Sequence, residues 1–190
     1  KVQYDWRETP IDWIPNYPFV SYFINQAHTI LPEGEYWMCR MFNRVLPQIQ
    51  DEKLKQDMQA FIKQEAMHAN AHATTHEGYL KQLKIDPSRN LHVTQFIVKK
   101  LLADHPLGFK LPTSLEREWD ILRLGIVATA EHLTCSFGRY VLYNTRWAEL
   151  GADAEMLDLM KWHAAEEIEH RTVAYDVYRH MGGGYIRRYL

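Results

Sequence analysis

Two short segments of the 190-residue chain place a glutamate three residues before a histidine. Glu65 precedes His68 in this way, and Glu167 precedes His170. On a helix, residues three apart lie on one face with their Cβ atoms about 5–6 Å apart, so a carboxylate and an imidazole with this spacing can bind one metal ion together. One such pair is weak evidence, because an exposed polar helix face offers the same two residue types.

Each Glu-x-x-His pair has a matching glutamate on the preceding predicted helix. In an antiparallel helical hairpin, residues equidistant from the turn lie at the same height, because each residue rises about 1.5 Å. Glu35 and Glu65 have their midpoint at residue 50, and Glu131 and Glu167 have theirs at residue 149; both midpoints fall in predicted turns. Glu131 also follows an apolar run, where a charge is costly unless it is paired or binds a metal. An ion pair with Arg139 is the alternative for this residue.

Four carboxylates and two histidines on four helices form the ligand set of ferritin-like proteins with two iron or two manganese ions. The chain resembles that superfamily over most of its length. Oxygen and nitrogen ligands without a thiolate suit iron or manganese. We therefore expect two iron ions, with manganese or a mixed iron–manganese pair as alternatives. Glu65 and Glu167 are the expected bridging ligands, and Glu35 and Glu131 the expected terminal ones. A purely structural bundle would not explain why four glutamates and two histidines occupy matching positions on the two hairpins.

A third histidine lies on the last predicted ligand helix. His163 precedes Glu167 by four residues and shares its face. An additional histidine at this place resembles the di-iron N-oxygenases that oxidise arylamines, which have three histidines and four carboxylates. A core histidine bonded to a carbonyl is the alternative. The expected metal ligands are therefore Glu35, Glu65, His68, Glu131, His163, Glu167 and His170.

Three further residues are expected to support these ligands from outside. Gln64 and Glu166 directly precede the two motif glutamates. In related bundles the residue at this place, often Asp, holds the metal-bound histidine of the opposite motif and fixes its orientation. By analogy Glu166 would hold His68 and Gln64 would hold His170, with a solvated Glu166 as the alternative. His72, four residues after His68, is a third candidate for this outer layer.

Two cysteines and one histidine near the ligands are assigned structural roles. Cys39 and Cys135 each follow a proposed ligand by four residues, so both are expected to face inward. A redox or ligand role is the alternative, but a buried free cysteine usually behaves as a small apolar residue, and we expect both to line a pocket beside the metals. His132 directly follows Glu131 and so points about 100° away from it.

The elements that must position these residues are all helical. Residues 1–32 are rich in aromatic residues and proline, and predict a coil followed by a short helix over about 18–30 that ends at Pro32. Residues 33–183 predict a ferritin-like four-helix bundle. Residues 184–190 predict the start of a further C-terminal element. Thr113, with Glu116 three residues on, predicts a capping box. Three of the four long helices of the bundle are expected at about 33–46, 52–84 and 114–147, and the last follows a turn marked by Gly151 and Asp153 and runs to about residue 181. A shorter crossover helix is expected at about 91–104.

Composition limits the partners and the compartment. The chain has 22 basic and 24 acidic residues, a net charge of −2, and a protein that neutralises nucleic-acid phosphates is normally more basic. Two cysteines exclude a disulfide framework and favour a reducing compartment. No apolar run is long enough to span a membrane. We expect a cytoplasmic protein without a nucleic-acid partner. A homodimer, and membrane association through sequence after Leu190, remain open.

Four segments carry a closer resemblance. Residues 31–35, 61–68, 162–170 and 174–178 resemble the bacterial family of predicted metal-dependent hydrolases, and the match spans roughly residues 20–185. The resemblance implies that the seven expected ligands are recurrent polar positions of that family. It also implies that apolar sequence follows the glycine-rich segment in many members.

Three kinds of chemistry compete for such a site. The expected one is an oxidase or oxygenase, in which two reduced irons activate O2 to oxidise a small or apolar organic substrate with electrons from a donor. A hydrolase that uses a metal-activated water is the first alternative, although no Lys or Arg accompanies the motifs to clamp an anion. A ferroxidase or iron-handling protein is the second, although a third histidine is unusual for storage.

Overall fold

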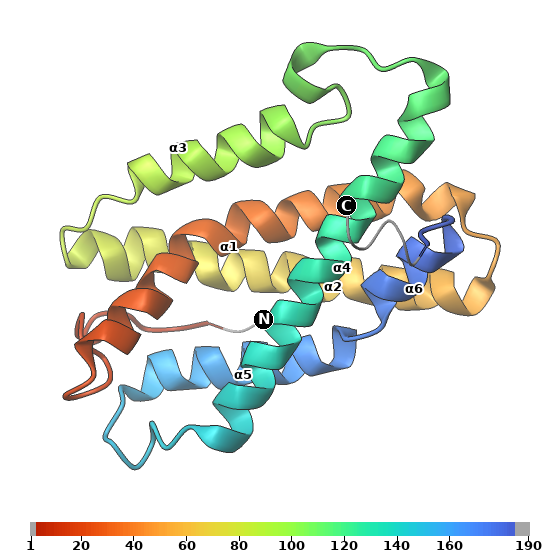
Figure 1. The fold of residues 1–190 in the computed structure, drawn as a ribbon. Coiled ribbons are helices and arrows are strands. Elements are labelled where there is room, and N and C mark those ends of the chain that lie inside the picture. The colour runs from red at the N-terminus through yellow and green to blue at the C-terminus, as the bar shows by residue number, and fades with distance from the viewer. Residues whose placement is uncertain (1–2, 185–190) are drawn as a thin grey trace.

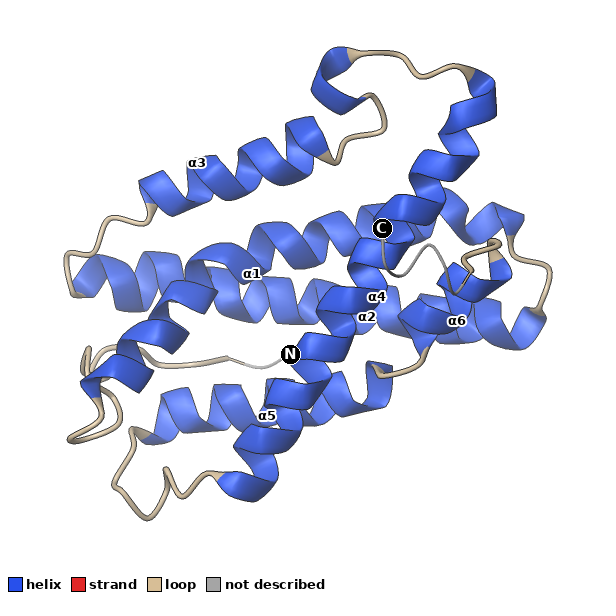
Figure 2. Ribbon diagram, viewed as in Figure 1, coloured by secondary structure: helices blue, strands red, loops and turns tan. Residues whose placement is uncertain are grey.

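The computed structural model describes residues 3–184, and the regular structure in this range is entirely helical, as the sequence predicts (Figures 1 and 2). Two 3₁₀ turns lie at Leu46–Gln48 and Pro106–Gly108, and two π-helical turns at His76–Leu80 and Ile97–Leu101. The α-helices are α1 (Pro18–Val45), α2 (Glu52–Thr75), α3 (Ser88–Phe96), α4 (Thr113–Asn144), α5 (Ala154–His170) and α6 (Val173–His180).

The long helices form two hairpins. Helix α1 packs along α2, and α4 packs along α5, while α3 lies beside α1 on the connection between the hairpins (Figure 1). Each hairpin turn ends in an aspartate that caps the next helix. The backbone N–H of Leu54 donates to Asp51 Oδ1 at 3.0 Å, and that of Met156 donates to Asp153 Oδ1 at 3.0 Å. These caps satisfy backbone donors that a helix start leaves free, and they lie at the predicted turns.

The predicted end of a helix at Pro32 is wrong, because α1 continues through this residue. The helix runs without interruption from residue 18 to residue 45 with Pro32 inside it, and it bends between its first turns and the rest (Figure 1). Proline has no N–H to offer the carbonyl four residues earlier, which bends a helix without always ending it. The part before Pro32 is held in place because Ile24, Asn25 and His28 are buried against the bundle.

The last predicted helix is divided in two. The chain turns at 171–172, and α6 leaves the direction of α5 to pack against α4 and α2. This turn brings Ala174 and Val177 into the apolar cluster that contains Leu124. The predicted capping box at Thr113 is also wrong. Pro112 precedes the first helical turn of α4, and no side chain caps it.

Two apolar clusters flank a buried polar centre. Along α2, Met58 and Phe61 belong to one cluster, Ala71 belongs to the other, and Glu65 and His68 lie between them. The second cluster also buries the N-terminal segment through three residues, Trp6, Trp13 and Ile14. The element predicted over 184–190 falls, apart from residue 184, outside the described residues. No described helix combines the length and the apolar character needed to cross a membrane.

Candidate metal centre

Four glutamates from four different helices meet in the interior. Glu35 comes from α1, Glu65 from α2, Glu131 from α4 and Glu167 from α5, and none is more than 4 % exposed. Neighbouring negative charges act on each other here: Glu65 and Glu167 both influence the ionisation of Glu35 and of Glu131. The structure therefore brings together the four carboxylates that the hairpin midpoints place at one level.

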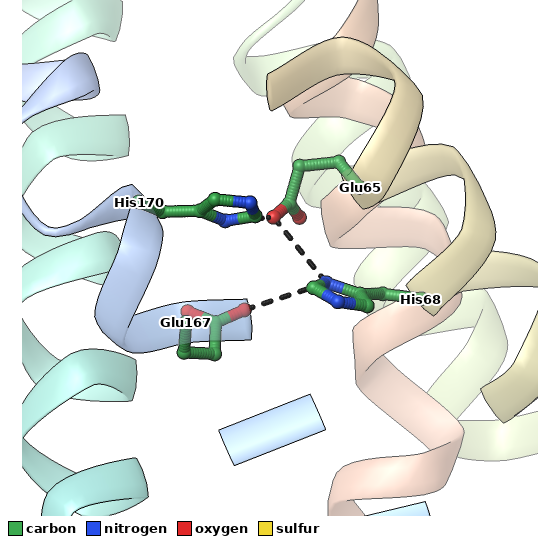
Figure 3. Close-up of side chains that lie close together, drawn as sticks. All are labelled: Glu65, His68, Glu167 and His170. Atoms are coloured by element: carbon green, nitrogen blue, oxygen red, sulfur yellow. Dashed lines mark ion pairs between the residues drawn. The ribbon is translucent and has the colours of Figure 1, made fainter. Parts of the chain in front are cut away.

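Two histidines flank Glu65 (Figure 3). His170 Nδ1 lies 2.9 Å from Glu65 Oε1, and His68 Nδ1 lies 3.4 Å from the same oxygen. His68 Nδ1 is also 3.5 Å from Glu167 Oε1, and His170 Nδ1 is 3.7 Å from Glu131 Oε2. Helices α2 and α5 thus present their Glu-x-x-His motifs to each other.

His163 extends the cluster on the side of α1. Its Nε2 lies 2.8 Å from Glu167 Oε1 and 3.7 Å from Glu35 Oε1. Glu65 and Glu167 are each close to two histidines, whereas Glu35 and Glu131 are each close to one. This central and outer placement is the one expected of bridging and terminal carboxylates.

The second nitrogen of each histidine is engaged from outside the cluster. His68 Nε2 lies 2.9 Å from Glu166 Oε2, and His170 Nε2 lies 3.0 Å from Gln64 Oε1. Both contacts are those expected from the sequence. His163 Nδ1 lies 2.6 Å from His72 Nε2. Such outer contacts fix the ring orientation of a histidine and leave its other nitrogen free for a metal.

The inner atoms lack hydrogen-bond partners. Within residues 3–184, both carboxylate oxygens of Glu35, Glu65 and Glu131 and the Nδ1 atoms of His68 and His170 make no hydrogen bond. Glu65 Oε1 and His170 Nδ1 are close, but they are not oriented as donor and acceptor. Buried polar atoms without partners are costly and rare. Their convergence on one region is what a set of metal ligands requires, so these residues fit an iron or manganese centre.

The pKa values of the buried glutamates also favour a bound cation. Burial, together with the charges of Glu65 and Glu167, raises the pKa of Glu35 well above its ordinary value. The same causes raise the pKa of Glu131. Burial also acts to raise the pKa of Glu65, but the adjacent His170 and His68 outweigh it and lower that pKa. Positive charge placed among these carboxylates would relieve their repulsion.

The donor atoms fall into two groups, each compact enough to surround one ion. Glu65, His68, Glu167 and His170 form the first, and Glu35, His72 and His163 form the second. His72, expected in the outer layer, therefore lies nearer the centre than its sequence position indicated. Glu131 belongs to neither group, although it is buried beside His170.

Three further contacts surround the centre that the sequence did not predict. His28 Nδ1 lies 2.7 Å from His72 Nδ1, the indole N–H of Trp162 donates to Glu166 Oε1 at 3.0 Å, and the Thr134 hydroxyl donates to Glu167. Helical spacing could have identified Trp162 and Thr134, because Trp162 is one turn before Glu166 and Thr134 follows Glu131 by three residues.

The two cysteines lie in the interior, as the spacing predicts, whereas His132 lies at the surface. Cys39 and Cys135 are both buried as free thiols. Burial and the nearby Glu65 and Glu35 raise the pKa of Cys39 to about 12, so it remains a neutral thiol. His132 is exposed. Arg139 is exposed as well, and the Glu131 oxygens make no hydrogen bond to it.

Comparison with known proteins agrees with this centre. The model of a family described as "predicted metal-dependent hydrolase" matches residues 1–190. No curated protein and no solved structure matches the chain. With a family match over its whole length and a buried cluster of carboxylates and imidazoles, the chain belongs to the family of predicted metal-dependent hydrolases.

Proposed function

We propose that the chain is a two-metal enzyme that activates O2. Its ligands are the seven residues predicted from the sequence: Glu35, Glu65, His68, Glu131, His163, Glu167 and His170. The observation that carries this proposal is the convergence of buried, unpartnered carboxylate and imidazole atoms in one region. Four carboxylates balance the charge of two divalent ions, so the assembled site is neutral, as a water-poor interior favours.

The surroundings of the site support oxidation of a small or apolar organic molecule. Two reduced iron ions can supply electrons to O2, and an external electron donor would reduce the iron ions again. Phe61 packs against the His170 ring at 4.9 Å and stacks on Phe42 at 4.3 Å, which shields this side of the centre from water. In the described part of the chain, the site glutamates form ion pairs only with histidines. These ion pairs include no Lys or Arg side chain that could bind an anionic substrate beside the glutamates.

The chain's own residues hold the site in shape. Glu166, itself anchored by Trp162, orients His68, and Gln64 orients His170. The Thr134 hydroxyl donates to Glu167 and restricts that carboxylate. The two hairpins and the third histidine support a place among ferritin-like dimetal bundles, near the arylamine N-oxygenases.

Hydrolysis is the second candidate, and the family description favours it. A pair of metal ions lowers the pKa of a bound water and can hold both sides of a displacement. In this case the same glutamates and histidines would hold a redox-inactive metal pair, and a carboxylate of the site would accept the proton of the attacking water.

One experiment separates the two reactions. The protein is loaded anaerobically with ferrous iron and exposed to O2 while dissolved oxygen and visible absorption are followed. A second sample is loaded with zinc and given p-nitrophenyl acetate and p-nitrophenyl phosphate. We expect O2 uptake by the iron form and no ester turnover by the zinc form. An iron form inert to O2 together with ester turnover by the zinc form would overturn the oxidase.

Control variants keep this comparison specific. Glu131→Ala should abolish the iron-dependent O2 uptake, and His132→Ala, which changes the exposed neighbour on the same helix, should leave it intact. Iron that accumulates as ferric deposits beyond the two proposed sites would identify an iron-handling protein.

A further inference from the structure

Helix α3 and the chain that follows it expose a row of apolar side chains. On the inner side, polar groups face α1: the Asn90 amide donates to the Thr29 hydroxyl at 3.2 Å. The Gln95 amide, and the Lys99 ammonium one turn later, both donate to Glu33. A surface helix usually has the reverse arrangement, with its apolar stripe toward the core. Six apolar residues that are between 38 % and 71 % exposed form what we call the outer patch: Val93, Phe96, Ile97, Leu101, Leu107 and Phe109.

The outer patch lies along one edge of the molecule. Helix α3 packs against α1, and its other side, with the connection to α4, forms the upper edge in the view of Figure 1. The π-helical turn at Ile97–Leu101 contacts the 3₁₀ turn at Pro106–Gly108, which brings the loop residues next to the helix. Leu107 has a φ of 53°, a left-handed backbone that is uncommon for leucine. Its side chain nevertheless remains at the surface, available to a partner.

The charge of this segment is opposite to that of the rest of the chain. Residues 88–110 include one acidic residue, Asp104, and four basic ones: Arg89, Lys99, Lys100 and Lys110. This leaves 18 of the 22 basic and 23 of the 24 acidic residues for the remaining chain. Asp104 is bound by Arg123 at 2.7 Å and by Arg44 at 3.2 Å, so other cations already balance it. Positive charge is therefore concentrated around the outer patch.

We propose that the outer patch binds the surface of an anionic lipid bilayer, with α3 lying parallel to the membrane plane. Arg89, Val93, Phe96 and Lys100 are exposed and follow one another at spacings of four, three and four residues, so they share one outward stripe with basic ends and an apolar middle. Apolar side chains of such a segment enter the boundary between headgroups and acyl chains. The basic side chains reach the lipid phosphates, because their long stems let the charged ends stay in the headgroup layer.

The same charges disfavour a second copy of the chain as the occupant. A two-fold contact would set the outer patch of one copy against the outer patch of the other. Basic residues would then face basic residues, whereas an anionic bilayer attracts them. None of the residues of the outer patch belongs to the metal centre, so this inference does not depend on the proposed function.

The first test measures binding of the purified chain to lipid vesicles by co-sedimentation. One set of vesicles consists of phosphatidylcholine, and the other is an equimolar mixture of phosphatidylcholine and phosphatidylglycerol. We expect binding to the mixed vesicles and little binding to phosphatidylcholine alone. The binding should weaken between about 0.05 M and 0.5 M NaCl, because salt shortens the range of the attraction. No binding to the mixed vesicles, or equal binding to both sets, would overturn the proposal.

The second test substitutes the basic and the apolar residues separately. Lys100→Gln should lower the partition coefficient for the mixed vesicles about fivefold, the usual effect of one basic residue near an anionic surface. Lys161→Gln removes an exposed lysine from α5 and is the matched control. Phe109→Ser should lower the coefficient about tenfold, since the ring no longer enters the apolar layer. Tyr143→Ser, at a residue of α4 with nearly the same exposure, is its control.

The outcomes separate lipid binding from other roles of this surface. All four substitutions lie at exposed or largely exposed positions, and equal melting temperatures would establish that the variants are folded. Controls that lose as much vesicle binding as Lys100→Gln and Phe109→Ser would overturn the assignment to the outer patch. Light scattering of the same proteins completes the test. A wild-type dimer that Phe109→Ser dissociates, together with no vesicle binding, would identify the outer patch as a contact between copies and overturn the proposal.

Discussion

Glu35 and Glu131 occupy equivalent places on the two hairpins, one on the first helix of each. Both are buried, both leave their oxygens without hydrogen bonds in the described part of the chain, and both have a pKa raised well above the ordinary value. In the metal-free protein the protonated, neutral form of each carboxyl group is therefore favoured over the charged form. Metal ions must displace these protons to use the carboxylates as ligands.

Metal affinity should therefore rise with pH. Above the ordinary glutamate value of 4.5, the metal-free protein still carries protons on Glu35 and Glu131, and these compete with the metal until the pH passes their raised pKa values. Isothermal titration with manganese in buffers of different ionisation enthalpy measures the protons released. We expect proton release that decreases as the pH rises. Binding without proton release between pH 5 and pH 7 would contradict the burial of these carboxylates in protonated form.

His163 separates this centre from one with a single histidine per metal. We expect His163→Ala to fold, because the two apolar clusters are untouched, and to retain at least one ion. It should weaken the other ion by at least about 10–100-fold and lose substrate oxidation far more than O2 uptake. Metal titrations of the variant that match wild type at both ions would show that His163 is a core histidine.

The residue types and their spacing were sufficient to predict which glutamates and histidines meet in the interior. The Glu-x-x-His spacing and the hairpin midpoints brought together residues that are far apart in the chain, and the outer contacts of Gln64 and Glu166 followed by analogy. His28 could not be found in that way. It lies before Pro32, where the sequence predicted the end of the helix, and its partner His72 is 44 residues away.

At the scale of elements, the start of α5 determines how its ligands meet those of α2. Asp153 caps this start, and its Oδ1 accepts from the N–H of Met156 and from the Thr9 hydroxyl. Thus one side chain fixes the helix terminus and anchors the N-terminal segment against it. The predicted hairpin geometry depends on this terminus, because a shift of one residue rotates every ligand on α5 by about 100°.

Asp153→Ala should destabilise the protein by about 0.5–2 kcal/mol, the usual cost of removing such a cap. Urea unfolding measures this free energy. Asp158→Ala is the matched control, since Asp158 is exposed on the same helix and its substitution should stay within about 0.5 kcal/mol of wild type. Equal stabilities of the two variants would show that the cap contributes nothing.

Local sequence cues predicted the hairpin turns but failed at the cap of α4 and at two positions where the predicted course of a helix was wrong. The two hairpin turns, which end at the capping residues Asp51 and Asp153, could be predicted because they depend on short-range chemistry. The continuation of α1 through Pro32 depends on burial of the turns before it, and the turn between α5 and α6 depends on how α6 packs against α4 and α2. Both are outcomes of tertiary packing, which the spacing of residues along the chain does not contain.

For the whole molecule, the candidate metal centre interrupts what would otherwise be one continuous apolar core. The two apolar clusters lie on either side of it, and buried glutamates and histidines take the place of apolar side chains in between. The all-helical class and the pairing of helices into hairpins could be predicted, because they follow from the apolar periodicity and the turn positions. Folding must nevertheless bury several ionisable groups, which costs free energy without a counter-charge.

Removal of metal should therefore lower the thermal stability, and more so at higher pH. A carboxyl whose pKa is raised by folding stabilises the native state below its unfolded pKa, and this contribution is lost as the pH rises toward the folded value. Glu35 and Glu131 both act in this sense. Bound metal at 100 times its dissociation constant adds about 2.7 kcal/mol. Melting curves at pH 5.5 and 7.5, with manganese and with chelator, test this. Identical curves with and without metal would contradict it.

The number of ions bound per chain tests the central claim most directly. Wild-type protein and Glu131→Ala are loaded anaerobically with excess ferrous iron, freed of unbound metal by gel filtration, and analysed for iron and protein. We predict two iron ions per chain for wild type and a loss of about one ion in Glu131→Ala. Less than one ion per chain in the wild type, after loading with iron and in parallel with manganese, would contradict the assignment of these glutamates and histidines as a two-metal centre.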